Sequence, residues 1–158
     1  MNKIVTIILS AVFFMGLFSC ETMEDPEIKN TSTWPLNGEY WVTYDGPTAP
    51  SGYHKIIISN TAADDGQSIL INDSELDLVI KADVDMEAVS FGVTDYAAND
   101  TTTVSISSGQ VITDGTMTPE SEVPTDSLYM EMEIVNPSQT EQLTISGYKY
   151  TGWTEDNH

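Results

Sequence analysis

The sequence predicts an all-β protein, an antiparallel up-and-down barrel of eight strands, with nine strands as the alternative count. From residue 34 onward, apolar residues recur with a period of two, which is the period of a strand with one buried face. Short intervals rich in Gly, Pro, Asn and Asp separate these runs. Evenly spaced strands of this kind are typical of a sandwich or a barrel, and closure into a barrel removes the exposed strand edges.

Residues 1–19, the first element of the chain, have the layout of a secretory signal peptide. Lys3 gives a positive start, an apolar stretch runs from Ile4 to Phe18, and Ser19 is a small residue at its end. The apolar stretch is shorter than the roughly 18 to 20 residues that span a bilayer. A retained transmembrane helix is therefore the weaker alternative.

Cys20 follows this leader directly and is the single cysteine of the chain. The tetrapeptide Leu17-Phe18-Ser19-Cys20 resembles the bacterial lipobox, whose cysteine is lipidated and becomes the first residue of the mature protein. Each buried CH₂ group of an acyl chain contributes about 0.8 kcal/mol, so several chains hold a soluble domain at a membrane. We expect anchoring to a membrane through Cys20. A chance cysteine after an ordinary cleavage site is the alternative.

Residues 20–33 are predicted to be the lipidated cysteine and a disordered acidic tether. Glu21, Glu24, Asp25 and Glu27 crowd its first half, and dense like charge opposes folding. The stretch is similar to the acidic export signal of lipoproteins in Bacteroidetes-type bacteria. That resemblance implies a secreted, lipid-anchored protein of the outer membrane, displayed at the cell surface. A spacer without a further role would have a similar composition.

Residues 34–158 form the predicted barrel domain. Its clearest strand is ELDLVIKADVDMEAV, residues 75–89, where the even positions from Leu76 to Met86 are apolar. A second alternating strand is SLYMEMEIV, residues 127–135. The remaining predicted strands are GEYWVTYD (38–45), YHKIIISN (53–60), SILIND (68–73), VSFGVTDY (89–96), TTVSISS (102–108), GQVIT (109–113) and LTISGYKYTGW (143–153).

Turn chemistry marks the intervals between these strands. Ser108-Gly109 predicts a turn that divides 102–108 from 109–113. The longest interval, residues 114–126, contains Pro119 and Pro124 and is predicted to be an exposed loop.

The charge of the chain excludes one class of partner. There are 25 acidic side chains against five basic ones, and the formal net charge is −20. Nucleic-acid binders carry a basic patch, so we exclude DNA and RNA as partners. We expect a soluble, monomeric domain without a cofactor. Oxygen ligands that lie close in sequence are Asn60, Asp64, Asp65 and Asn72-Asp73. Their spacing does not match a calcium-binding EF-hand loop, so no metal site is predicted.

The order of four motifs resembles a known family. LNGEYWVTYDG, YHKIIISNTA, LDLVIKADVDMEAVSFGV and SGYKYTGW together resemble the Bacteroidetes lipoproteins called lipid-binding putative hydrolases, over residues 34–155. The resemblance implies a small lipocalin-type, calycin-like barrel. In that family, a Trp in a Gly-x-Trp triplet of the first strand plugs the closed end of the barrel. The matching triplet here is Gly38-Glu39-Tyr40, and Trp41 stands one position late, so Tyr40 is the expected plug.

The resemblance, laid onto the inward faces of the strands, implies an interior that binds a small hydrophobic, lipid-like ligand without catalysis. Two neighbouring methionines would suit an adaptable pocket. The predicted ligand-binding residues are Tyr40, Val42, Ile56, Ile58, Leu78, Ile80, Val84, Met130, Met132 and Ile134.

Two other functions stay open. The first is a surface module that binds glycan or protein at the barrel rim, for which the early aromatic residues from Trp34 to Tyr53 are the candidates. The second is a weak esterase. A serine hydrolase needs a base, and His54 is the single histidine apart from His158, while no Gly-x-Ser-x-Gly motif occurs. We therefore expect no catalytic residues.

Overall fold

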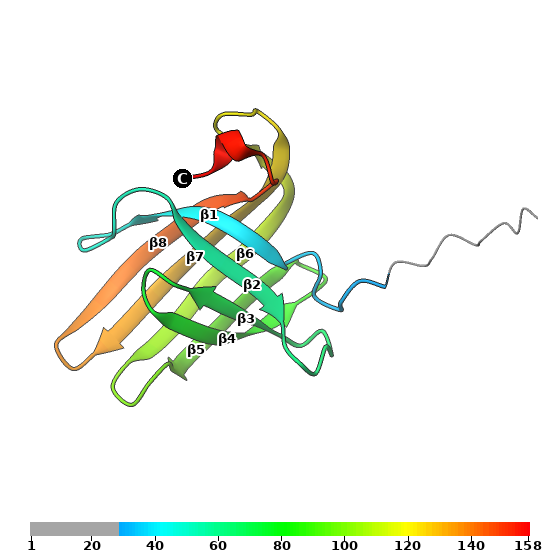
Figure 1. The fold of residues 1–158 in the computed structure, drawn as a ribbon. Coiled ribbons are helices and arrows are strands. Elements are labelled where there is room, and N and C mark those ends of the chain that lie inside the picture. The colour runs from blue at the N-terminus through cyan, green and yellow to red at the C-terminus, as the bar shows by residue number, and fades with distance from the viewer. Residues whose placement is uncertain (1–28) are drawn as a thin grey trace, which may run out of the picture.

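The computed structural model describes residues 29–158, so the predicted signal peptide, Cys20 and most of the tether lie outside the described residues. Each of the eight strands pairs antiparallel with the next, and β8 pairs with β1 to close the barrel (Figure 1). This arrangement confirms the predicted all-β barrel and its eight strands. The elements are β1 (Gly38–Asp45), β2 (His54–Asn60), β3 (Ser68–Asp73), β4 (Leu78–Asp85), β5 (Ser90–Ala97), β6 (Thr103–Met117), β7 (Pro124–Asn136), β8 (Gln139–Lys149) and the short 3-10 helix η2 (Thr154–Asp156).

The core lies inside the barrel because apolar residues alternate with polar ones along the strands. In β4, for example, Leu78, Ile80 and Ala82 are buried, whereas Lys81 and Asp83 between and beyond them are exposed. All eight strands contribute to one buried apolar cluster. Within residues 29–158, no helix is long and apolar enough to cross a membrane.

The predicted turn at Ser108-Gly109 is wrong, because β6 runs through this position as one strand from Thr103 to Met117. The pairing register with β7 shifts between Ser107 and Gln110, which marks a β-bulge. Ser108 has a positive φ of 55°. A Cβ on Gly109 would overlap the carbonyl oxygen of Phe91 and lie 2.6 Å from its ring. Small residues therefore permit a bulge here rather than a strand end.

The predicted loop at 114–126 is also largely strand. The ends of β6 and β7 continue the ladder, with Thr116 opposite Thr125 and Met117 opposite Pro124. Proline is tolerated there because it is the first residue of β7 and need not donate a ladder hydrogen bond. The connection shortens to residues 118–123.

The predicted strand 75–89 is too long. Its regular part, β4, spans Leu78–Asp85. Leu76 and Met86 lie in the turns on either side, where they are half-buried and pack against the core. Their apolar character extends the period-two pattern beyond the strand itself.

The segment before β1 fills one end of the barrel. Residues 32–36 form a turn, and Leu36 and Tyr40 are both fully buried. The Tyr40 hydroxyl donates a hydrogen bond to the Leu36 carbonyl oxygen at 2.9 Å. Burial, together with the charge of Asp126, raises the pKa of Tyr40, so the phenol remains a neutral donor.

The folded structure before β1 includes residues 31–33, which were predicted to be part of the disordered tether. The Trp34 amide donates to the Thr31 carbonyl oxygen at 3.1 Å, and Thr33 is fully buried. The Asn37 side chain donates to the Thr31 hydroxyl at 2.9 Å. Residues 31–33 thus belong to the folded domain.

Candidate functional site

The barrel interior brings together all of the predicted ligand-binding residues. They come from four strands and all are buried except Val84, which is half-buried near the end of β4 and packs against the core. Their positions are Tyr40 and Val42 on β1, Ile56 and Ile58 on β2, Leu78, Ile80 and Val84 on β4, and Met130, Met132 and Ile134 on β7. The predicted residues thus form inward-facing apolar positions on β1, β2, β4 and β7.

Further buried residues that the prediction left out come from β3, β5, β6 and β8 and from other positions on β4 and β7. The same alternation marks them in the sequence, because buried apolar positions alternate with more exposed ones on β3, β6 and β8. These additional buried residues are Ile69, Ile71, Ala82, Phe91, Val104, Ile106, Val111, Leu128, Leu143 and Ile145. Aliphatic, methionine and aromatic side chains from the whole circumference therefore meet inside the barrel and pack into one buried cluster.

A buried polar pair lies at the end of the barrel opposite the Leu36 turn. The Tyr44 hydroxyl donates to Asp73 Oδ2 at 2.8 Å. The other carboxylate oxygen accepts the amides of Glu75 and Leu76, both at 3.1 Å. Asp73 is fully buried, and the loss of water around its charge raises the pKa of this carboxyl above its ordinary value, against the lowering effect of these bonds. Burial and the nearby Asp73 charge raise the pKa of Tyr44 as well.

His54 joins this end of the barrel to the β3–β4 turn. Its Nδ1 lies 3.0 Å from Glu75 Oε2, and its Nε2 lies 3.1 Å from the Ser51 carbonyl oxygen. The imidazole also meets the Tyr44 ring edge to face, with 5.6 Å between the ring centroids. Both ring nitrogens are thus occupied by acceptors, whereas a general base needs a free nitrogen directed at a nucleophile. The arrangement positions the turn and the β1–β2 loop.

Replacing Asp73 with asparagine is expected to stabilise the barrel at neutral pH by about 1 kcal/mol. In the asparagine variant, Oδ1 can still accept the amides of Glu75 and Leu76, and the side-chain NH₂ can donate to the Tyr44 hydroxyl oxygen, so that contact persists in the reverse direction while the buried charge is removed. Because the folded-state pKa of Asp73 is raised, folding favours the protonated carboxyl. Its contribution to the free energy of unfolding is therefore full below the unfolded-state pKa and is lost as pH rises through the folded-state pKa. The gain should therefore shrink as pH falls through the raised folded-state pKa towards about 4, and it should be absent below that pH. Urea unfolding at neutral pH and below about pH 4 measures this gain in stability, with Asp83→Asn at an exposed position as the matched control. A gain that grows in acid would contradict the raised pKa of Asp73.

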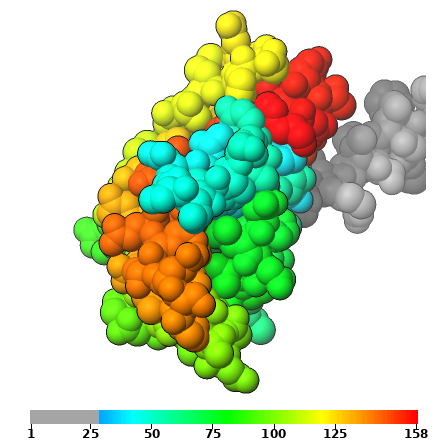
Figure 2. Space-filling view, turned by 90° about the vertical axis from the view of Figure 1, so that its left-hand side faces the viewer, coloured from blue at the N-terminus to red at the C-terminus, as the bar shows by residue number. Residues whose placement is uncertain are grey.

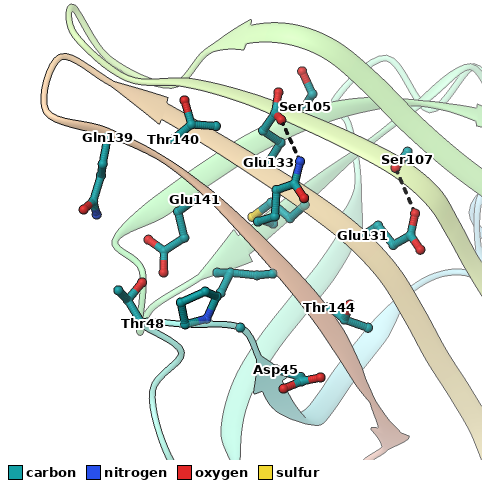
Figure 3. Close-up of a pocket in the computed structure, with 15 residues that line it drawn as sticks. Asp45, Thr48, Ser105, Ser107, Glu131, Glu133, Gln139, Thr140, Glu141 and Thr144 are labelled. Carbon is teal, nitrogen blue, oxygen red and sulfur yellow. Dashed lines mark hydrogen bonds between the residues drawn. The ribbon is translucent and has the colours of Figure 1, made fainter.

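An acidic groove of about 1000 Å³ lies on the outer face of β6, β7 and β8. Its side chains form cross-strand pairs, in which Ser107 donates to Glu131 at 3.3 Å and Gln142 donates to Glu133 at 3.1 Å (Figure 3). Met132, one of the predicted wall residues, borders it. Its lining residues are Asp45, Gly46, Pro47, Thr48, Ser105, Ser107, Glu131, Met132, Glu133, Gln139, Thr140, Glu141, Gln142, Leu143 and Thr144.

The C-terminal segment packs against the outside of the barrel, between the β6–β7 loop and the β1–β2 region (Figure 2). It covers Trp41, which faces away from the interior and is only 8% exposed. The His158 ring meets Trp41 edge to face at 5.6 Å, and Lys55 Nζ lies 4.9 Å from the indole centroid. Trp41 is therefore part of a second, external packing layer. Sequence reasoning missed this layer because the contacting residues are far apart in the chain.

Asp156 fastens this segment to the β6–β7 loop. Its carboxylate accepts the amides of Glu120 and Ser121, each at 3.1 Å, and the Ser121 hydroxyl at 2.5 Å. Burial acts to raise the pKa of Asp156, but the bonds from Ser121 and Glu120 outweigh it and lower the pKa below its ordinary value. The ionised carboxylate is thus the form that holds the loop.

Acidification is expected to release this loop. Since the folded-state pKa of Asp156 is lowered, its stabilisation is present above the unfolded pKa and is lost as pH falls through the folded value. Hydrogen-exchange protection of the Glu120 and Ser121 amides should be high at neutral pH and fall in acid. Asp156→Ala should reduce protection of both amides about tenfold at neutral pH. Equal protection in the variant and the parent would contradict the role of Asp156.

Comparison with known proteins relates the barrel to a family. The model of the family described as lipid-binding putative hydrolase matches residues 25–154, which include all eight strands. A solved structure from Bacteroides ovatus, a structural genomics target of unknown function, is similar with 14% identity and a TM-score of 0.49 over 77% of this chain. This chain spans 44% of that chain, and no curated protein matches. The family match covers most of the sequence, so the protein belongs to the lipid-binding putative hydrolase family.

Proposed function

We propose that the protein is a lipid-anchored bacterial lipoprotein of the outer membrane whose barrel binds a small hydrophobic ligand and performs no chemistry. The observation that carries the ligand-binding part is the closed barrel with an apolar wall around its whole circumference. The membership of a lipid-binding family supports the same reading. The leader and the tetrapeptide ending at Cys20 support the anchoring part.

The interior is suited to a flexible apolar ligand. Met130 and Met132 are adjacent inward positions on β7 and both are buried. Methionine has three rotatable bonds and a polarisable sulfur, so these side chains can repack around a chain of variable shape. Tyr44 and Asp73 provide one polar group at the end of the apolar wall, where a ligand with a polar head would orient.

The absence of chemistry is supported by the geometry around His54. Its two nitrogens are held by Glu75 and the Ser51 carbonyl oxygen. A base in this state cannot take a proton from a serine hydroxyl unless one of those contacts breaks. His54→Ala should therefore leave any background hydrolysis of short acyl esters unchanged.

Two mass measurements on the full chain, purified from bacterial membranes in mild detergent, separate the anchor from the ligand. A lipid on Cys20 is covalent and remains under denaturing conditions, whereas a bound ligand is present only in the native spectrum. Native mass in excess of the denatured mass supports ligand binding, and identical masses in repeated preparations oppose it.

A matched pair of variants locates the ligand. Met132→Trp places a large side chain inside the barrel and should displace the ligand, at a stability cost of about 1–3 kcal/mol. Val135→Trp adds the same side chain to the outer face, at a position 41% exposed, and should retain the ligand. Circular dichroism verifies that both variants fold. Retention of the ligand by Met132→Trp would place it outside the barrel.

The anchor has its own test. Labelled palmitate should appear on the full chain and disappear from Cys20→Ser. Label on that variant would remove the proposed anchor and leave the ligand-binding proposal untouched.

A further inference from the structure

A second groove, different in chemistry from the acidic one, lies on the outer face where β1, β6, β7 and β8 run side by side. Its volume is about 440 Å³. Outward residues of neighbouring strands form its floor, with Thr43 opposite Ser146 and Tyr148 opposite Ser127. Tyr53 of the β1–β2 loop borders it on one side, and residues of β6 border it on another. We call it the neutral groove.

The neutral groove carries no charge on a strongly acidic protein. None of its lining residues, all within residues 29–158, is acidic or basic, although the chain has 25 acidic side chains. The lining instead offers three tyrosine rings, Tyr53, Tyr129 and Tyr148, together with serine and threonine hydroxyls. This combination of aromatic surface and neutral hydroxyls selects against ions and in favour of uncharged polar molecules.

Tyr53 is held in place before any ligand arrives. Its ring stacks on His158, which does not line the groove, with 4.0 Å between centroids and an interplanar angle of 16°. The Tyr148 hydroxyl, in turn, lies 2.6 Å from His158 Nε2 and donates to the Asp156 carbonyl oxygen at 3.3 Å. The C-terminal segment thus fixes two of the aromatic rings, while Tyr53 remains 38% exposed. Rings fixed in advance lose little entropy when a ligand binds.

Hydroxyl groups in the groove are free to meet a polar ligand. Within the described part of the chain, no hydrogen bond involves the hydroxyl oxygens of Ser127 and Ser146, which lie on the outer face. Each hydroxyl can donate one hydrogen bond and accept two. They therefore supply polar partners beside the tyrosine rings.

We propose that the neutral groove binds an uncharged saccharide. A sugar ring presents aliphatic C–H groups on one face, which suit the negative face of an aromatic ring, and hydroxyls around its edge, which suit serine and threonine. The volume of about 440 Å³ lies in the range of small-molecule sites. Saccharides with carboxylates are disfavoured by the net charge of −20. The site is on the outside of the barrel and is independent of a ligand in the interior.

Saturation-transfer NMR on the full chain tests this site with defined probes. The neutral set is the methyl glycosides of glucose, galactose, mannose and N-acetylglucosamine with their disaccharides, and the charged set is glucuronate and galacturonate. At least one neutral probe should receive saturation, whereas the uronates should not. Tyr53→Ala should weaken binding about tenfold by removing the stacking ring, and Tyr53→Phe should preserve it.

Trp34→Ala is the matched control, because Trp34 is an aromatic residue that is 54% exposed and lies outside the groove. This variant should bind as the parent does. The proposal is overturned if no neutral probe receives saturation from the folded protein, or if the uronates bind equally well. It is also overturned if Tyr53→Ala binds like the parent, or if Trp34→Ala and Tyr53→Ala lose binding to the same extent.

Discussion

Replacing Gly147 with alanine is expected to destabilise the barrel by more than about 3 kcal/mol, because the added methyl group has no space at the seam that closes the sheet. Gly147 lies on β8 opposite Val42 of β1. A Cβ at this position would overlap the Trp41 carbonyl oxygen and would lie 2.7 Å from the Val42 Cα and 2.8 Å from the Trp41 carbonyl carbon. These neighbours are backbone atoms, so relief requires the two strands to separate.

Gly38→Ala provides the matched control. Its added Cβ would also meet a close neighbour, at 2.6 Å, but that neighbour is the Cε atom of the flexible Lys149 side chain. The side chain can move aside at little cost, so this variant should unfold at nearly the parental denaturant concentration. Urea unfolding followed by circular dichroism measures both variants. Similar midpoints for the two would show that the seam tolerates a Cβ and would contradict the prediction.

The barrel could be predicted because its determinants are local. A strand with one buried face must alternate, and ELDLVIKADVDMEAV and SLYMEMEIV do so within a few residues. The predicted turn at Ser108-Gly109 was wrong because the same pair of residues is compatible with a turn and with a β-bulge. Ser108-Gly109 is a common turn pair, but it also permits the positive φ and the close backbone approach of a bulge. Nothing local distinguishes the two, since pairing with β7 decides the outcome.

The two prolines in residues 114–126 were likewise compatible with two structures, a loop and the start of a strand. Pro119 does lie in the connection, whereas Pro124 is the first residue of β7. A proline interrupts a central strand but is compatible with a strand start. Whether a proline lies in a loop or at a strand start thus depends on where the hydrogen-bonded pairing with the neighbouring strand ends. The sequence of one strand does not determine that position.

The interior wall was accessible to sequence reasoning, whereas the polar contacts around it were not. Alternation assigns Ile56, Ile80 and Met130 to one face without knowledge of their partners. Tyr44 and Asp73, however, are 29 residues apart, and Ser121 and Asp156 are 35 apart. Such pairs are created by closure of the barrel and by docking of the C-terminal segment. Each residue alone reads as an ordinary acidic or hydroxyl side chain.

Tyr40→Ala is expected to cost about 3–5 kcal/mol, because it removes a fully buried aromatic ring from the end of the barrel where the Leu36 turn lies. Tyr40→Phe should cost only about 1 kcal/mol, since the ring remains and the single bond to the Leu36 carbonyl oxygen is lost. The two variants therefore separate filling of the barrel end from hydrogen bonding. Chemical denaturation gives both free energies.

A variant at the neighbouring Trp41 tests whether an aromatic ring at position 41 can replace the Tyr40 ring inside the barrel. Trp41 faces the outside, under Lys55 and His158, and so it cannot fill the interior when Tyr40 is absent. In the double variant Tyr40→Ala with Trp41→Tyr, stability should stay near that of Tyr40→Ala or fall below it. Recovery of parental stability would mean that β1 can shift its register by one residue to present the new ring inward. Such a shift would turn Val42 outward and would break the pairing register of β1 with both β2 and β8. We therefore expect that it does not occur.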